Sequence, residues 1–85
     1  MNHKHTSHPT IIARLKRAEG HLAKVIKMLE QQSPCADVAQ QLHAVEKAVT
    51  NAKRALIHDH IDHCLTGKDD SRQAAEELKS ISKYL

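Results

Sequence analysis

Apolar residues recur along the first third of the chain at alternating steps of four and three. The series is Ile11, Leu15, Ala18, Leu22, Val25 and Leu29, with Ile12 and Ile26 beside it. This period predicts an amphipathic helix of about 20 residues. Pro9 suits the first turn of that helix, where a missing N–H breaks no hydrogen bond. The polar break at residues 31–34 ends the pattern, and Ser33 followed by Pro34 is typical of the cap and first position of a second helix.

A second apolar series follows the break and is longer than the first. It comprises Cys35, Val38, Leu42, Val45, Val49, Ala52 and Leu56. Residues 35–66 contain neither Gly nor Pro, so we expect one helix of about 30 residues, ended by Gly67 as its C′ residue. Asp70, with Gln73 three positions later, is typical of the capped start of a third helix. The apolar face of that short helix comprises Ala74, Ala75, Leu78, Ile81 and Leu85.

These patterns predict an all-α protein, with no strand alternation or internal repeat. The expected protomer has three helices: a long antiparallel hairpin of the first two and a short C-terminal helix. We interpret residues 1–85 as a single domain, with residues 1–8 as a flexible His-bearing tail. Apolar faces this long exceed what one hairpin can bury, so we expect the copies to associate into a helical bundle.

The composition excludes several classes of protein. No apolar run approaches the roughly 18 residues of a membrane span, and no secretory signal is visible. With two cysteines in 85 residues, we expect a reduced, cytoplasmic protein without a membrane partner. The chain has no Ser/His/Asp set, no phosphate-binding Gly loop and no paired carboxylates in a cleft. We therefore do not expect an enzyme.

Positive charge is concentrated near the N-terminus. Residues 1–31 carry a net +4, whereas the whole chain carries +3. An excess of this kind indicates a polyanionic partner such as double-stranded DNA, although a solvated helix face would give the same count. The long helices do not match a helix-turn-helix, so we expect basic helix faces to contact the DNA. The candidates are Arg14, Lys16 and Arg17, followed by Lys47, Lys53 and Arg54.

Three residues of the expected second helix have the chemistry of a metal site. His60 and Cys64 are four residues apart, so they share one helix face and can chelate a soft or borderline metal ion. The alternative is an incidental surface imidazole near a packed thiol. Cys35 lies at the expected start of the helix, where the backbone amides favour a thiolate. It also continues the apolar series, so simple packing is its other interpretation.

The distance between these residues requires a second copy of the chain. Cys35 precedes His60 by 25 residues, which is about 38 Å along a continuous helix. One copy therefore cannot bring Cys35, His60 and Cys64 to one ion. Two antiparallel copies of the helix can, because the start of each then lies beside the end of the other. Such a dimer has two equivalent sites.

The ordered set of these residues resembles the copper-sensitive operon repressor family, which includes nickel/cobalt-responsive and formaldehyde-responsive branches. The resemblance extends from about Thr10 to Leu85, and the matching segments are RLKRAEGHL at 14–22, Cys35, QQLHAV at 40–45, His60 and Cys64. It implies that residues 1–85 are a single metal-sensing, DNA-binding domain with a three-helix protomer and a dimer of dimers. It also implies repression at double-stranded operator DNA that is relieved when the effector binds.

The resemblance also implies roles for particular residues. Cys35, His60 and Cys64 match the Cys-His-Cys ligands of the copper-sensing branch. Glu77 matches a carboxylate that links the metal-bound histidine to the third helix. The copper branch has a tyrosine just before the first cysteine, where this chain has Pro34, so that part of the coupling network is in doubt.

The N-terminal histidines decide which metal we favour. Two thiolates and one imidazole suit Cu(I). In the nickel and cobalt branches an N-terminal histidine or amine adds a ligand, and His3 or His5 can do so here. Together with the Met1 amine, His3 also offers a square-planar set for Ni(II) or Cu(II). We therefore favour Ni(II)/Co(II), with Cu(I) as the main alternative and Zn(II) or another effector after it.

Three other functions are alternatives to metal sensing. The formaldehyde branch relies on a proline after the initiator methionine, and this chain has Asn2 there. A thiol-redox or persulfide sensor would use Cys35 and Cys64, but it has no need of His60. A histidine-rich metal carrier would bind metal without specific duplex binding.

Overall fold

Three helices make up the part of the chain that the structure describes, residues 7–66 and 71–85 of a computed structural model. They are α1 (His8–Glu30), α2 (Cys35–Thr66) and α3 (Ser71–Ser82). No strand occurs in these two ranges, and the all-α prediction is confirmed. The expected 30-residue second helix is also confirmed, because α2 runs unbroken for 32 residues. The expected caps at Gly67 and Asp70 lie outside the described residues.

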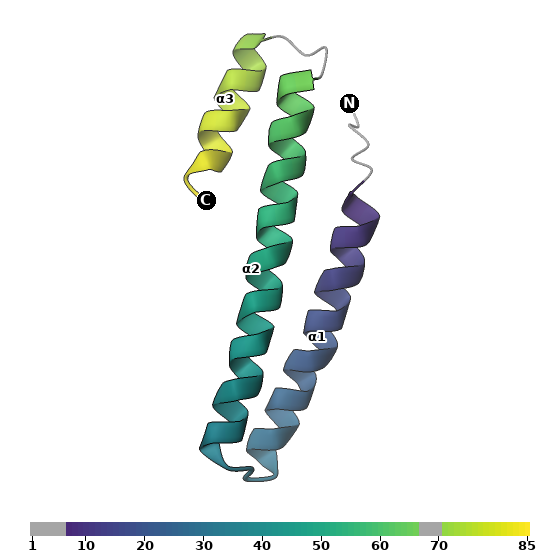
Figure 1. Ribbon diagram of the computed structural model, residues 1–85, viewed down its shortest axis with the longest axis vertical. Helices are drawn as coiled ribbons and strands as arrows, with labels where there is room; N and C mark the ends of the chain where they lie inside the picture. The colour runs from purple at the N-terminus through teal and green to yellow at the C-terminus, as the bar shows by residue number, and fades with distance from the viewer. Residues whose placement is uncertain (1–6, 67–70) are drawn as a thin grey trace.

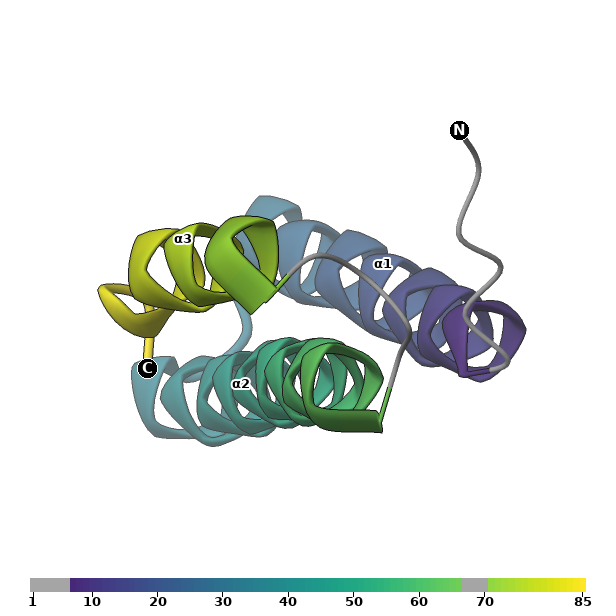
Figure 2. The same ribbon diagram turned by 90° about the horizontal axis from the view of Figure 1, so that it is seen from above.

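The helices form a hairpin with a third helix folded back on it. Figure 1 shows α1 and α2 side by side and antiparallel, joined at one end of the molecule, while α3 returns along the far end of α2. Seen from above, α3 lies against α2 (Figure 2). The result is a rod with principal extents of 54 × 23 × 16 Å.

Backbone hydrogen bonds in the α1–α2 turn mark the end of α1. The amide of Ser33 donates to the Met28 carbonyl at 2.9 Å, and the amide of Gln32 donates to the Leu29 carbonyl at 3.1 Å. Gln32 has φ 59°, the left-handed conformation in which this type of helix ending places one residue. The Pro34 carbonyl accepts the first α2 bonds, from Asp37 and Val38. This pattern places Pro34 in the N-cap position, so α2 starts one residue later than predicted.

The core of the hairpin is a narrow seam of small and branched side chains. Its members recur every seven residues, as Ile11, Ala18 and Val25 on α1 and Val38, Val45 and Ala52 on α2, and Ile57 is buried further along α2. The sequence predicted a single apolar face, but only part of that face packs inside the protomer. Leu15, Leu22 and Leu29 are 42–59% exposed, because one partner helix covers only one edge of the stripe.

Candidate metal centre

His60 lies near the C-terminal end of α2, where α3 folds back over it. Its side chain is 22% exposed, and its Nε2 atom lies 3.6 Å from Oε2 of Glu77 on α3. Nε2 itself is buried. A carboxylate that faces one ring nitrogen is the arrangement that commonly orients a metal-binding imidazole. The structure therefore brings together His60 and Glu77, which only the resemblance had related.

Cys35 lies at the opposite end of the same helix. It is the first residue of α2, and its thiol is free and exposed. Figure 1 shows the start of α2 at the hairpin turn and its last turns beside α3, at the other end of the rod. The premise that one copy cannot join Cys35 to His60 is thus confirmed by a continuous α2.

The spacing of the two residues also places them on one side of α2. At about 100° per residue, a separation of 25 residues brings His60 back to within about 20° of Cys35. Cys64 lies one turn beyond His60 within α2, and its side chain is outside the described part. Within that part, no group of three His, Cys, Asp or Glu side chains in one protomer is placed to hold a metal ion.

The N-terminal histidines divide into two groups. His3 and His5, the candidate extra ligands, lie outside the described residues. His8 was assigned to the tail but is the first residue of α1. Its Nε2 lies 3.9 Å from Oδ2 of Asp59, near His60 in the sequence. The start of α1 is therefore held against the same end of α2 that carries His60 and Cys64.

One side of the hairpin is an uncovered apolar surface, which we term the apolar flank. Its members are 40–52% exposed, apart from Leu29 at 59%. They are Ile12, Leu15, Leu22, Ile26 and Leu29 of α1 and Leu42, Val49 and Leu56 of α2. Cys35 precedes Leu42 by seven residues and His60 follows Leu56 by four, so both lie in line with this flank. The candidate ligands thus lie at the two ends of the apolar surface.

The other side of the hairpin has basic residues around shallow surface hollows, and we term it the polar flank. A hollow of about 450 Å³ is lined by Arg14, Arg17, Ala18, His21, Ala48 and Asn51. Two further hollows continue it along the seam, and they add Gly20, Lys24, Lys27, Met28, Gln31 and Gln41. Two of the predicted DNA-contacting residues, Arg14 and Arg17, therefore lie together here.

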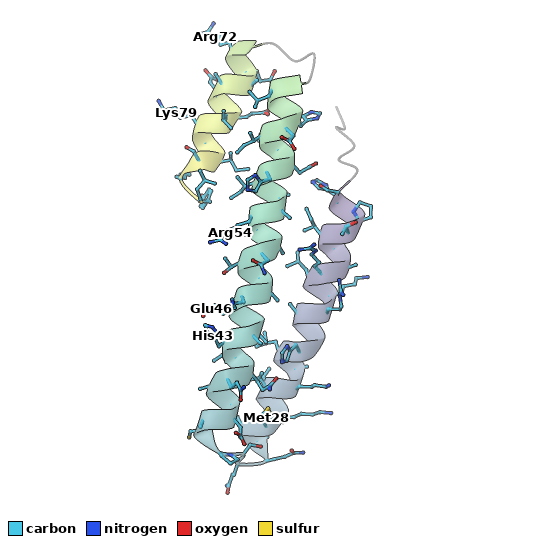
Figure 3. The ribbon with its side chains drawn as sticks, in the orientation of Figure 1. Met28, His43, Glu46, Arg54, Arg72 and Lys79 are labelled. Carbon is cyan, nitrogen blue, oxygen red and sulfur yellow. The ribbon has the colours of Figure 1, made fainter. Side chains whose placement is uncertain are left out.

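The remaining basic candidates lie elsewhere. Lys16, Lys47, Lys53 and Arg54 are all exposed, and none lines these three hollows. Figure 3 shows Arg54 on the side of α2 that faces away from α1. The six basic candidates consequently do not form a single surface on one protomer.

A contact between His21 and Gln41 was missed by sequence reasoning. The His21 Nε2–H donates to Oε1 of Gln41 at 2.7 Å, between α1 and α2. A signal existed, because each residue follows a buried position, Ala18 or Val38, by three. Two polar residues at equivalent edges of facing apolar series indicate a contact across the seam.

The protomer is a long helical hairpin with an uncovered apolar side. It carries a Cys at one end of α2 and, at the other end, a His that faces a carboxylate. Residues 7–85 match the metal-sensitive transcriptional repressor family, and the chain belongs to that family. The resemblance seen in the sequence is thereby confirmed. So is the exclusion of an enzyme, because the family consists of repressors.

Named relatives include sensors of two metals. The chain is 40% identical over 74 residues to the copper-sensing transcriptional repressor CsoR of Mycobacterium ulcerans, covering 84% of this chain and 63% of that protein. It is 34% identical over 87 residues to CsoR of Bacillus subtilis, covering 98% and 86%. The nickel-responsive transcriptional regulator InrS has the same fold, with a TM-score of 0.82, 30% identity and coverage of 99% and 98%.

The chain spans less than two thirds of the length of the mycobacterial relatives. The matches to Bacillus subtilis CsoR and to InrS extend over most of both partners. Among the described residues, no helix has the length and apolar character needed to cross a bilayer.

Proposed function

We propose that this chain is a metal-responsive transcriptional repressor that binds operator DNA without metal and releases it when a metal ion binds between two copies. The site would join Cys35 of one copy to His60 and Cys64 of the other. The observation that carries this proposal is the placement of Cys35 and His60 at opposite ends of one rigid helix, in line with an uncovered apolar flank. We expect the protein to act in the cytoplasm.

The apolar flank supplies the reason for two copies to associate. Leu22, Leu42 and Val49 are each more than two-fifths exposed, and burial of apolar area is the main driving force of such association. If two hairpins pack antiparallel through this flank, α2 of one copy runs against α2 of the other. Cys35 of each copy then meets the end of α2 that carries His60 in its partner. Two such dimers would form the expected tetramer.

The donor set fits a transition metal ion. Cys35 is exposed at a helix N-terminus, which favours its thiolate. Glu77 faces Nε2 of His60, as a carboxylate commonly faces a metal-binding imidazole. When bound, the ion supplies a link between the two copies. Glu77 then connects the occupied site to α3. A redox sensor that used Cys35 and Cys64 would not require His60 to face Glu77.

The ion we favour is Ni(II) or Co(II), with Cu(I) as the alternative. The relatives named above include copper-sensing repressors and a nickel-responsive regulator of the same fold. Two thiolates and an imidazole suit Cu(I), whereas an added N-terminal nitrogen from His3 or His5 suits Ni(II). Replacement of His3 and His5 should therefore weaken binding of Ni(II) and leave Cu(I) binding intact.

The shared site can be tested by mixing two defective copies. Cys35→Ala removes one half of each site, and His60→Ala with Cys64→Ala removes the other half. In an antiparallel heterodimer of the two variants, one site retains all three ligands and the other loses all three. We expect each variant alone to show no metal-dependent release of DNA, and the refolded mixture to regain about half of the sites in each heterodimer.

Two results would contradict the proposal. A mixture that regains no site would mean that the ligands come from one copy. A wild-type protein that binds metal but shows no change in operator affinity would be a metal carrier rather than a sensor. Titration of operator binding with Ni(II), Co(II) and Cu(I) in turn identifies the ion.

A further inference from the structure

The three hollows of the polar flank join into one continuous groove along the α1–α2 seam. The first and second share Arg17 and His21. The second and third share Lys24 and Gln41. From Arg14 to Lys27 the groove follows 13 residues of α1, which is about 20 Å.

The groove is positively charged throughout. Four cations line it, and none of the described residues that line its three hollows is acidic: Arg14, Arg17, Lys24 and Lys27. The two carboxylates of α1 lie elsewhere. Glu19 follows Leu15 by four residues, which places it beside the apolar flank, and Glu30 follows Lys27 by three but lines none of the three hollows. The four cations of the groove are therefore not neutralised by a carboxylate in its lining.

The width of the groove is held by a contact between its two walls. His21 on α1 and Gln41 on α2 are joined by the 2.7 Å hydrogen bond at the middle of the groove. Beside them, Ala18 and Ala48 line the first hollow with short side chains. Amide groups of Gln31 and Asn51 lie at the ends, where they can donate hydrogen bonds to an oxyanion.

The groove stays open in the proposed dimer. Association through the apolar flank covers the opposite side of the hairpin, and α3 packs on α2 rather than on α1. A ligand that occupies the groove must be polyanionic, since four cations extend over about 20 Å without an intervening carboxylate.

From these observations we infer that the groove binds the phosphates of one strand of duplex DNA, with Lys24 and Lys27 contacting phosphates beyond those held by Arg14 and Arg17. This inference rests on the proposed function and deepens it. Lys24 and Lys27 become DNA contacts, while His21 and Gln41 become positioning residues whose hydrogen bond sets the distance between the walls. Amide and guanidinium donors along a helix seam fix the backbone of the duplex and read no bases.

The test measures salt-dependent binding of the metal-free protein to a fluorescein-labelled 40-base-pair duplex of mixed sequence, between 50 and 200 mM salt. The test variant is Lys24→Ala with Lys27→Ala, and the control is Lys79→Ala with Lys83→Ala. The control removes the same charge from exposed positions at and beyond the end of α3, where Lys79 points outward (Figure 3). Circular dichroism and mass measurement establish that both variants keep the helices and the oligomer.

Each phosphate contact contributes about 0.9 to the slope of log affinity against log salt. We expect the test variant to lower that slope by about 2 for each groove in contact, with at least about a tenfold loss of affinity at 100 mM salt. The control should leave the slope unchanged. Equal effects of the two variants, or no effect of the test variant, would overturn the inference.

Two further measurements separate this inference from the proposed function. If Arg14→Ala with Arg17→Ala lowers the slope while Lys24→Ala with Lys27→Ala does not, the phosphate contacts end at the first hollow, which overturns the inference although DNA binding stands. If the unaltered protein binds no duplex at low salt, both ideas fail. Tighter, equally groove-dependent binding of a 40-nucleotide single-stranded RNA would identify a different occupant and overturn the inference.

Discussion

The two sides of the α1–α2 hairpin differ although they share the same buried seam. Leu22 and His21 are neighbours in the sequence, yet Leu22 lies on the apolar flank and His21 faces Gln41 across the polar flank. The apolar flank lacks a partner within the protomer, whereas the polar flank is already bridged. One side of the hairpin is thus suited to a second copy of the chain and the other to a polyanion.

The largest effect is expected from a charge placed on the apolar flank. Leu22→Glu should prevent dimerisation, because an unpaired carboxylate buried in the interface costs about 3–5 kcal/mol. The protein should become monomeric by analytical ultracentrifugation and lose metal-dependent release of DNA. Lys24→Glu, two residues away on the other flank, is the matched control and should remain oligomeric while losing affinity for DNA. If Leu22→Glu stays oligomeric, the apolar flank is not the interface.

A smaller effect is expected from neutralising the polar flank. Arg14→Ala with Arg17→Ala removes two cations that line one hollow. We expect at least a tenfold loss of operator affinity and a salt slope lower by about 2 per bound groove. Fluorescence anisotropy across a salt series measures both quantities. Lys79→Ala with Lys83→Ala removes equal charge outside the groove, from exposed positions that are not candidate DNA contacts, and a matching loss there would show that the groove has no special role.

The link between His60 and Glu77 should affect metal binding without affecting metal-free DNA binding. Glu77→Gln removes the charge that faces His60 Nε2 across 3.6 Å. Loss of such an orienting carboxylate typically costs 10–100-fold in metal affinity. Competition titration against a chromophoric chelator measures this change. Glu76→Gln, an exposed neighbour, is the control, and equal losses in both variants would remove Glu77 from its proposed role.

The smallest effect is expected at the bridge of the polar flank. Gln41→Leu leaves His21 without its acceptor, which should cost about 1 kcal/mol of folding free energy. For a chain of this size that lowers the Tm by about 4–8 °C, measured by thermal unfolding at fixed protein concentration. The exposed neighbour Gln40 provides the control as Gln40→Leu. An unchanged Tm in Gln41→Leu would mean that the bridge does not stabilise the hairpin.

The helices and the candidate ligands could be predicted from the sequence because both depend on local spacing. Alternating steps of three and four predicted α1 and α2. The separation of 25 positions from Cys35 to His60 predicted a site shared by two copies. The unbroken α2 confirms the basis of that prediction. The shared site itself stays a prediction, as do the ligand roles of His3, His5 and Cys64.

The division of the apolar series into buried and exposed halves could not be predicted from spacing. Ala18 and Leu22 fit the same helical period, but Ala18 is 6% exposed and Leu22 is 42% exposed. Close approach of α1 and α2 favours the smaller side chain in the seam, and only the packing of both helices reveals this preference. The approach of His8 to Asp59 was missed for a related reason, since it depends on where the first turn of α1 meets α2.

The unbroken α2 also limits how sequences of this kind can diverge. Inserting one residue between Cys35 and His60 would rotate one against the other by about 100° and lengthen the span by about 1.5 Å. The change would act on both metal sites of the proposed dimer and on the register of the apolar flank together. Insertion of seven residues restores the angle but adds about 10 Å. The length of α2 is therefore constrained more tightly than most of its exposed side chains.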